Sequence, residues 1–290
     1  MFFIIKRMFE FLPVNAPEFL YTTIFKPEPL KKLVNWILLL IIPDKLLLPF
    51  NRTLFLNKKD PVVSGAISFG VYENFEISLF KKELHRGMTV VDIGANIGYY
   101  TVMAAHFVGV NGKVIAFEPD EQSGKVLEKN IIINKFNNVL YENKALSDKN
   151  GIVKLYISEE NRGDNRIYDT KDGRKYVEVE TITLDKYLPK ETKIDLIKMD
   201  VQGAESLILS GMEQTITKSK ILTIFTEFWP KAITETGKSP EEFLQKLINL
   251  GFSLHVINDT KKCLEKITNI NYFAHKYKGR KYANIVCYKK

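Results

Sequence analysis

Two acidic residues, Asp92 and Glu118, stand at the ends of successive short apolar runs, and a glycine turn follows the first of them. The first carboxylate can accept hydrogen bonds from the ammonium group of an amino-acid moiety, and the second can accept from both hydroxyls of a ribose. The dinucleotide fingerprint G-x-G-x-x-G does not match, because Asn96 stands where its second glycine lets the backbone approach a pyrophosphate. S-adenosylmethionine has an amino-acid moiety and a ribose but no phosphate, so the pattern predicts this cofactor.

Consecutive β-α units must position these acids. Residues 90–93 predict a buried strand, residues 94–98 a tight turn, and the residues from Tyr99 onward a helix. Residues 114–117 predict the next strand, and the two acids at residues 120–121 suit the first turn of another helix. Two such units in succession imply a parallel sheet, and in open α/β sheets ligands bind at the carboxyl edge.

Further strands extend this sheet and bring their number to seven. They are predicted, the last two as an antiparallel edge pair, at residues 139–145, 194–200, 221–225, 252–257 and 282–288. Asp200 ends one of these strands and therefore also belongs to the ligand-binding edge.

A polar loop, residues 158–175, separates two alternating segments at residues 152–157 and 176–182 that predict a β-hairpin insertion. It contains Arg-Gly-Asp-Asn-Arg at residues 162–166. One interpretation is a substrate clamp or lid over a binding cleft. The other is a hairpin excursion with a solvated tip, and the sequence leaves both open.

Length and composition predict one α/β domain with a small appendage. The 290 residues are 45% hydrophobic and 26% charged, which excludes a disordered chain. The two cysteines lack metal-ligand spacing, which indicates a reducing compartment, and the four histidines form no cluster for a structural zinc. The net charge of +8 suits nucleic acid, an anionic membrane or an acidic substrate, but scattered lysines and arginines also describe a plain solvated surface.

Residues 1–70 lack the regular succession of strand and helix patterns that the rest of the chain shows. Residues 33–42 form an apolar run that is too short to cross a bilayer, which takes about 20 residues. The run starts too late for a signal peptide and lacks a clear cleavage site. We expect either a packed helical appendage or a peripheral contact of residues 1–60 with a membrane or a partner. The expected location is cytoplasmic, with peripheral membrane attachment under the second interpretation.

Three stretches resemble the FkbM family of S-adenosylmethionine-dependent methyltransferases. They are VVDIGANIGYYTVMAA at residues 90–105, IAFEPD at residues 115–120 and LIKMDVQGAESLILSGM at residues 196–212. Smaller matches support them at residues 72–73, 145–148, 163–166 and 183–185 and at Glu227. The resemblance covers about residues 71–260 and implies a methyltransferase domain at residues 71–290 after an N-terminal appendage at residues 1–70.

The resemblance also implies a fold and a set of site residues. The fold is an α/β, Rossmann-like class I methyltransferase fold with a mostly parallel seven-stranded sheet, an antiparallel edge strand, a β-hairpin insertion and a small helical N-terminal appendage. The cofactor-binding residues would be Glu73, Asp92, Gly94, Ala95, Asn96, Gly98, Glu118, Pro119, Lys144 and Ala145. Asp164 and Arg166 would contact the substrate.

Asp200, Glu205 and Glu227 would face the reaction cleft. Methyl transfer to an aliphatic hydroxyl needs a base, or a metal that lowers the pKa of the hydroxyl. Asp200 is the first candidate for this base, and magnesium held by Asp200 and Glu227 is the metal alternative. Asp200 could instead bond backbone at a strand end, and Glu205 could simply favour a helix N-terminus. The chain departs from the family at Gln202, where an acid is usual.

The resemblance implies an O-methyltransferase that acts on a sugar hydroxyl of a glycan, a glycolipid or a glycosylated metabolite. A nucleic-acid (RNA) methyltransferase is the alternative that the positive charge favours. Against it, the chain lacks the N/D-P-P-Y/F motif of adenine-amino methylation, and no cysteine follows a proline. A non-catalytic scaffold that binds the cofactor is the third hypothesis.

Overall fold

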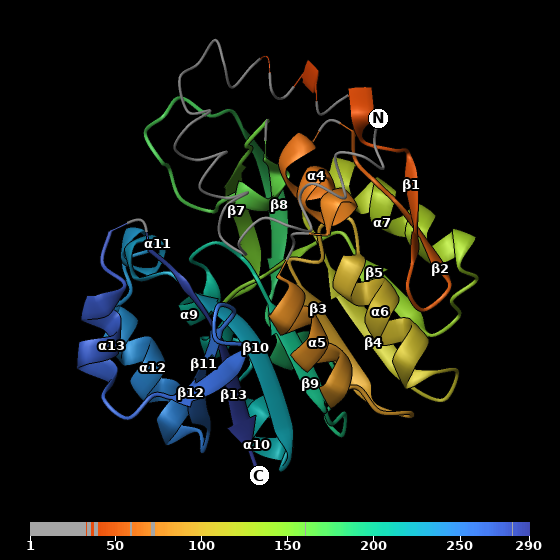
Figure 1. Cartoon of the computed structure of the whole chain (residues 1–290). Coiled ribbons are helices and arrows are strands. Elements are labelled where there is room, and N and C mark those ends of the chain that lie inside the picture. Colours follow the sequence, from red (N-terminus) through yellow and green to blue (C-terminus); the bar gives the residue numbers. More distant parts are fainter. Residues whose placement is uncertain are drawn as a thin grey trace.

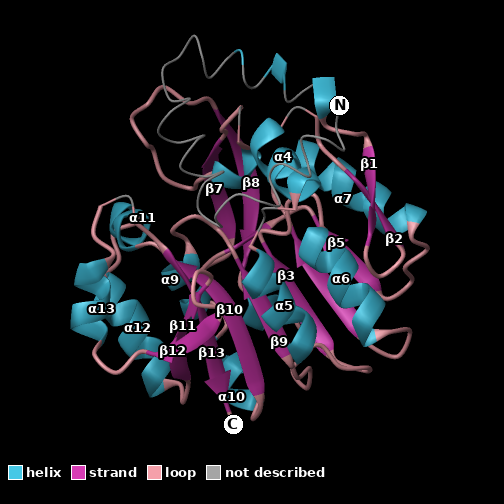
Figure 2. Cartoon of the chain, viewed as in Figure 1, coloured by secondary structure: helices cyan, strands magenta, loops and turns pink. Residues whose placement is uncertain are grey.

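The computed structural model describes residues 33, 36–37, 40–58, 60–70, 73–159, 161–279 and 281–290. Predictions that involve Tyr72 or most of residues 1–39 lie outside the described residues. The described chain has three layers, in which helices cover both faces of a central sheet (Figure 1, Figure 2).

Eight strands form this central sheet in the described part of the chain, in the spatial order β12-β11-β13-β10-β9-β3-β4-β5. The five strands from β10 to β5 run parallel to one another, which confirms the predicted β-α succession. The strand bounds are β3 Thr89–Ile93, β4 Lys113–Phe117, β5 Val139–Glu142, β9 Leu196–Met199, β10 Leu222–Phe228, β11 Ser253–Asn258, β12 Cys263–Lys266 and β13 Ala283–Lys289.

The sheet differs from the seven-stranded prediction on the side of β10. The antiparallel strand β13 pairs with both β10 and β11 and is therefore internal, while β12 adds an eighth strand at the edge. Ile285, Val286 and Cys287 at the centre of β13 are fully buried. An apolar run indicates that a strand is buried, but it does not indicate which strands lie beside it. The predicted antiparallel pairing of the last two strands is confirmed, since β11 pairs with β13, but the order of these strands beside β10 was not predicted.

Alternate residues of the parallel strands face the two helical layers. Val90 and Val114 pack with α5 and α6, which lie in front of the sheet in Figure 1. Val91 and Ile115 pack in the larger core cluster with residues of α8 to α13. The helix bounds are α4 Pro61–Phe69, α5 Asn74–Glu83, α6 Tyr99–Val108, α7 Glu121–Ile133, α8 Leu184–Tyr187, α9 Glu205–Ser210, α10 Glu213–Lys218, α11 Pro230–Glu235, α12 Pro240–Asn249 and α13 Ile270–Lys276.

A second sheet forms beside the carboxyl edge of the first. β7 (Gly151–Tyr156) and β8 (Tyr176–Ile182) pair antiparallel and confirm the predicted β-hairpin insertion. The short strand β6 (Ala145–Leu146) adds to β8 in parallel. The loop between β7 and β8 contains a 3-10 turn at Arg162–Asp164.

The described part of residues 1–70 contains a strand pair that was not predicted. β1 (Lys45–Leu48) and β2 (Arg52–Phe55) form an antiparallel hairpin, and α4 follows it. The side chain of Asn130 in α7 accepts from the N–H of Phe55 and donates to its carbonyl, at 2.6 and 3.0 Å. The hairpin is thus attached to the domain that follows it, and the domain boundary at residue 70 stays a prediction. Among the described residues, every helix is too short or too polar to cross a membrane.

Candidate active site

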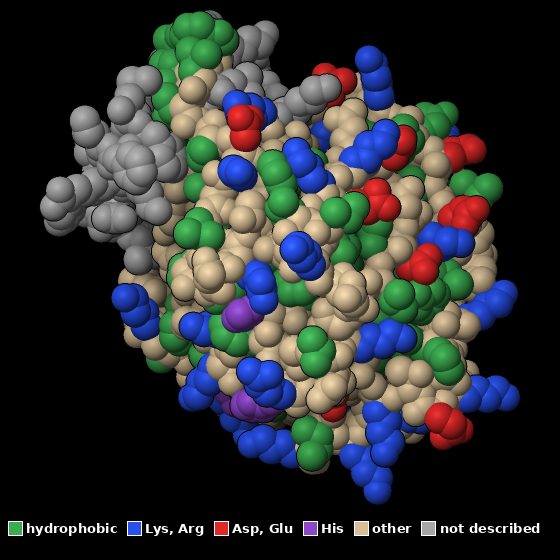
Figure 3. Space-filling view, turned by 90° about the vertical axis from the view of Figure 1, so that its right-hand side faces the viewer, with side chains coloured by type: hydrophobic (Ala, Val, Ile, Leu, Met, Phe, Trp, Pro, Cys, Tyr) green, Lys and Arg blue, Asp and Glu red, His purple; other side chains and the backbone are tan. Residues whose placement is uncertain are grey.

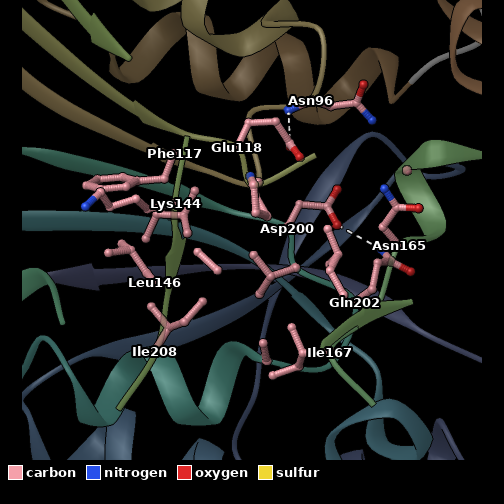
Figure 4. A pocket seen from close by; sticks show the side chains of 18 of the residues that line it. Asn96, Phe117, Glu118, Lys144, Leu146, Asn165, Ile167, Asp200, Gln202 and Ile208 are labelled. Atoms are coloured by element: carbon pink, nitrogen blue, oxygen red, sulfur yellow. Dashed lines mark hydrogen bonds between the residues drawn. The ribbon is translucent and has the colours of Figure 1, made fainter. Parts of the chain in front are cut away.

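A cavity lies at the carboxyl edge of β3, β4 and β9, with α9, β6 and the β7–β8 loop closing its other sides (Figure 4). Polar side chains of the strand ends line one part of it, and the apolar side chains of Leu146, Ile167 and Ile208 line another. The predicted site residues that line the cavity are Gly94, Asn96, Glu118, Pro119, Lys144, Ala145 and Asp200.

The turn after β3 is fastened to both neighbouring strands. The backbone N–H groups of Gly94 and Ala95 donate to the carbonyl oxygen of Phe117, at 2.9 and 3.0 Å. Gly94 has φ +79°, and a Cβ at this position would lie 2.0 Å from the carbonyl oxygen of Asp200. Only glycine permits this close approach, which brings the predicted cofactor turn and Asp200 together.

Two backbone groups hold the side chain of Glu118 at the cavity. Its Oε2 accepts from the N–H of Asn96, and its Oε1 accepts from the N–H of Asp120, both at 2.8 Å (Figure 4 shows the first of these bonds). Each carboxylate oxygen has a further lone pair, so both can also accept from ribose hydroxyls. Burial raises the pKa of Glu118 to about 7, because the charged form is poorly solvated.

The described residues offer what the cofactor requires beyond this carboxylate. The side-chain oxygen of Asn96 is buried and has no hydrogen-bond partner, although this residue lines the cavity. Phe117, Leu146 and Ile208 supply apolar surface on which an adenine can pack. Unused polar atoms beside apolar walls fit the adenosine and amino-acid groups of S-adenosylmethionine.

Asp92 and Gly98 do not line the cavity. Asp92 is 2% exposed, and its carboxylate accepts from the hydroxyl of Thr101 at 2.5 Å. Burial raises the pKa of Asp92 to about 6. Gly98 caps the start of α6 with φ +86°. Their predicted contacts with the cofactor therefore stay predictions, and the visible role of both residues is to support the turn.

Glu73 is half-buried and lies near the buried acid Glu227 of β10. Its two carboxylate oxygens accept from the hydroxyl of Tyr100 at 2.7 Å and from the amide of Asn284 at 3.3 Å. Asn284 is paired with Glu227 across β13 and β10. Burial raises the pKa of Glu73. The predicted cofactor contact of Glu73 stays a prediction, because it does not line the cavity.

Lys198 on β9 provides positive charge beside these acids. Its Nζ lies 2.8 Å from Oε1 of Glu76, and both side chains are at most 2% exposed. Burial on its own lowers the pKa of Lys198, but the carboxylates of Glu76, Glu73 and Asp200 outweigh burial and raise this pKa above its ordinary value. Lys198 therefore carries a charge in the folded protein. This pair was not predicted, and its signal in the sequence is a lysine inside an otherwise apolar strand.

Replacing Lys198 with methionine is expected to lower the free energy of unfolding by about 3–5 kcal/mol, because the buried acids lose their counter-charge. Urea unfolding followed by circular dichroism measures this loss. Lys125→Met is the matched control, since Lys125 is 67% exposed and pairs with Glu121 on the surface of α7. We expect a change within about 1 kcal/mol for this exposed pair. Equal losses in the two variants would contradict the stabilising role of the buried ion pair.

Gln202 connects two of the predicted catalytic acids. Its Nε2 donates to Oδ1 of Asp200 at 2.9 Å and to Oε2 of Glu227 at 3.1 Å (Figure 4 shows the first of these bonds). Burial and the neighbouring Asp200 raise the pKa of Glu227 well above its ordinary value. The amide bridge thus holds two carboxyl groups together without a second acid at position 202.

The same bridge bears on the predicted magnesium site. Magnesium needs oxygen ligands, but an N–H donor occupies the position between Asp200 and Glu227 where a shared cation would bind. Among the described residues, no group of three or more His, Cys, Asp or Glu side chains is arranged to hold a metal ion. The donor set therefore does not fit magnesium held by this pair.

Glu205 is fully buried at the first turn of α9. Its Oε1 accepts from the N–H of Val201 at 3.3 Å, which caps the turn between β9 and α9. Burial raises the pKa of Glu205 to about 7. This position matches the helix N-terminus alternative, and a catalytic role for Glu205 stays a prediction.

The β7–β8 loop is attached over the cavity through Arg162. Its guanidinium donates to both oxygens of Asp120 at 2.8 and 2.9 Å, and both side chains are less than 10% exposed. The backbone N–H of Arg162 donates to Asp60, immediately before α4. Gly163 and Asn165 line the cavity. These contacts favour the clamp or lid interpretation. Arg162 was not among the predicted site residues.

The predicted substrate residues Asp164 and Arg166 pair with each other. Asp164 also binds Arg174 at 2.6 Å, and the guanidinium of Arg166 lies 4.7 Å from the ring centroid of Trp229. Neither residue lines the cavity, so their contact with a substrate stays a prediction. The visible effect of this network is to stiffen the loop that carries Asn165.

Known methyltransferases are similar to this chain in sequence. A family model of the methyltransferase FkbM domain matches residues 92–254, which contain Glu118, Asp200 and Glu227. The 2-O-methyltransferase NoeI of Sinorhizobium fredii (strain NBRC 101917 / NGR234) is 29% identical over 171 residues, which are 52% of this chain and 67% of NoeI. The ribosomal protein L11 methyltransferase of Thermotoga maritima is 30% identical over 110 residues, 36% of this chain and 41% of that protein.

Solved structures of low sequence identity also resemble the chain. The methyltransferase FkbM of Methylobacillus flagellatus KT has a TM-score of 0.42 and 12% identity, covering 90% of this chain and 60% of that one. The putative methyltransferase SMU.1697c of Streptococcus mutans, solved with SAH, has a TM-score of 0.44 and 12% identity, covering 74% of this chain and 97% of that one. On the family match, which spans more than half of its length, the chain belongs to the FkbM family of S-adenosylmethionine-dependent methyltransferases.

Proposed function

We propose that the protein is an O-methyltransferase whose acceptor is a sugar hydroxyl of a glycan, a glycolipid or a glycosylated metabolite. The observation that carries this proposal is the carboxylate of Asp200, which lines the cavity next to the cofactor turn and is held by Gln202. The resemblance to a 2-O-methyltransferase supports oxygen as the acceptor atom. The sugar as acceptor is the finer part of the proposal and rests on the family resemblance.

Transfer to a hydroxyl requires that its proton is removed as the new bond forms. The bound cofactor supplies the methyl group on a sulfonium, and displacement in line with it requires an aligned acceptor oxygen. Among the acids beside the bridge, Asp200 faces the cavity, while Glu227 does not line it, and burial and the neighbouring Asp200 raise the pKa of Glu227. Asp200 would therefore accept the proton, and Gln202 would hold its carboxylate in one orientation.

The acceptor can be tested with methyl-labelled S-adenosylmethionine and separated cell extracts. We expect label in the carbohydrate or glycolipid fraction, in a form that survives mild alkali because a methyl ether is stable where a methyl ester is cleaved. Asp200→Asn serves as the control for enzymatic transfer. Label that appears in RNA and disappears on ribonuclease treatment would replace the sugar with a nucleic-acid acceptor. Cofactor binding without transfer to any fraction would favour a scaffold.

A further inference from the structure

Large apolar side chains are exposed together just before β1. Leu33, Trp36, Ile37 and Leu40 are helical and 51%, 58%, 40% and 64% exposed. Their spacing of three and four residues places them on one face of a helix. Leu47 on β1 adds a further apolar side chain that is 73% exposed. Clusters of this kind mark surfaces that contact a partner or a membrane.

The residues that follow attach this segment to the domain. Ile41 and Ile42 are 8% and 2% exposed. Ile42 packs in the cluster that contains Leu48, Leu54 and Val102 of the hairpin and α6. The exposed helical face therefore directly precedes Ile41 and Ile42, which are packed against the domain. Residues 33–43 contain no charged side chain, so an apolar environment would bury no charge there.

Basic side chains lie beside the apolar ones. Lys45 is exposed and stands two residues from Leu47, on the same side of β1. Across the hairpin, Lys45 is paired with Phe55. The ammonium of Lys129 lies 3.6 Å from the centroid of the Phe55 ring. Figure 3 shows the side of the molecule that is on the right in Figure 1. Hydrophobic side chains gather at the top of that view, and lysines and arginines outnumber acids over the remaining surface.

We propose that this apolar and basic surface docks on an anionic lipid bilayer, with Trp36 and Leu40 entering the headgroup region. Tryptophan suits the membrane interface, and lysines attract anionic lipids. Two copies of the chain would bring together net charges of +8 each, which opposes pairing through this basic face. The inference goes beyond the proposed methyl transfer and does not depend on the identity of its acceptor.

Co-sedimentation of the full chain with vesicles tests the proposal. The vesicles are phosphatidylcholine alone or phosphatidylcholine with phosphatidylglycerol. We expect sedimentation with the anionic vesicles that weakens as salt is added. The double variant Trp36→Glu, Leu40→Glu should bind these vesicles at least about tenfold more weakly, because two apolar side chains that would enter the bilayer become charged.

The double variant Val110→Glu, Ile221→Glu is the matched control. Val110 and Ile221 are 91% and 73% exposed outside the proposed surface, and the charge changes equally. We expect this control to bind the anionic vesicles like the unchanged protein. Calorimetric binding of S-adenosylmethionine shows that each variant is folded.

Three results would overturn the proposal. The first is equal sedimentation of the two double variants, and the second is no sedimentation of the unchanged protein with either kind of vesicle. The third is a dimer in analytical ultracentrifugation that only Trp36→Glu, Leu40→Glu dissociates, which would assign the surface to a second copy of the chain.

Discussion

Replacing Asp200 with asparagine is expected to lower kcat by about 10²–10⁴-fold, the range in which a positioned general base contributes. Asparagine has nearly the same shape, and its amide oxygen can still accept from Gln202, so the bridge to Glu227 remains. Asparagine cannot take a proton from a hydroxyl at neutral pH. The expected loss is therefore in the chemical step, while the affinity for S-adenosylmethionine stays near that of the unchanged protein.

Single-turnover transfer and calorimetry separate these two quantities. Asp195→Asn is the matched control, since Asp195 immediately precedes β9 at its opposite end and accepts from the N–H of Thr89 at 2.7 Å. We expect this control to keep its rate. If Asp200→Asn transfers methyl groups at nearly the normal rate, another group removes the proton. If neither Asp200→Asn nor the unchanged protein transfers to carbohydrate, the acceptor is wrong instead.

Replacing Glu118 with glutamine is expected to weaken the binding of S-adenosylmethionine by about 100-fold, because two charge-assisted hydrogen bonds to the ribose become neutral ones. The new amide also places an N–H donor toward the backbone N–H of Asn96 or Asp120, both of which now donate to Glu118. This mismatch adds to the loss of affinity.

The pH dependence of this affinity follows from the raised pKa of Glu118. In the free protein this pKa is about 7, because burial disfavours the charged form. Ribose hydroxyls donate to the charged form, so binding must expel the proton wherever the carboxyl group is protonated. Affinity in the unchanged protein should therefore fall as the pH decreases below about 7, at most tenfold per pH unit for one proton.

Calorimetry across neutral pH tests both expectations for Glu118. Glu118→Gln should lose most of this dependence on pH along with the affinity. Glu121→Gln, three residues further along the chain on the exposed side of α7, is the matched control and should bind like the unchanged protein. An unchanged affinity in folded Glu118→Gln would remove the ribose contact from the site.

Several parts of the site could be predicted from short stretches of sequence. The strand before Asp92, the turn with Gly94 and the acid at position 118 are local features, because periodicity and glycine positions depend on neighbouring residues. Position 118 does line the cavity, as does Asp200 at the end of a distant strand. Both positions follow from one rule, that parallel strands end at the same edge.

Other features depend on contacts between distant residues. Arg162 meets Asp120 across 42 positions, and Lys198 pairs with Glu76 on another element. The position of β13 between β10 and β11 also depends on distant residues, since strand order is not a local property. Side-chain pairs of this kind have no periodic signature in the sequence.

The sequence was sufficient for the order of β-α units, the hairpin insertion and the family, because hydrophobic periods and motif spacing record them along the chain. The division of roles among the acids came from the folded arrangement. Asp92, Glu205 and Glu227 all looked suited to a ligand, yet burial and neighbouring charge raise their pKa values, and Gln202 links Glu227 to Asp200. Solvation and distance determine what a carboxyl group can do, and both arise only when the strands and the loop pack together.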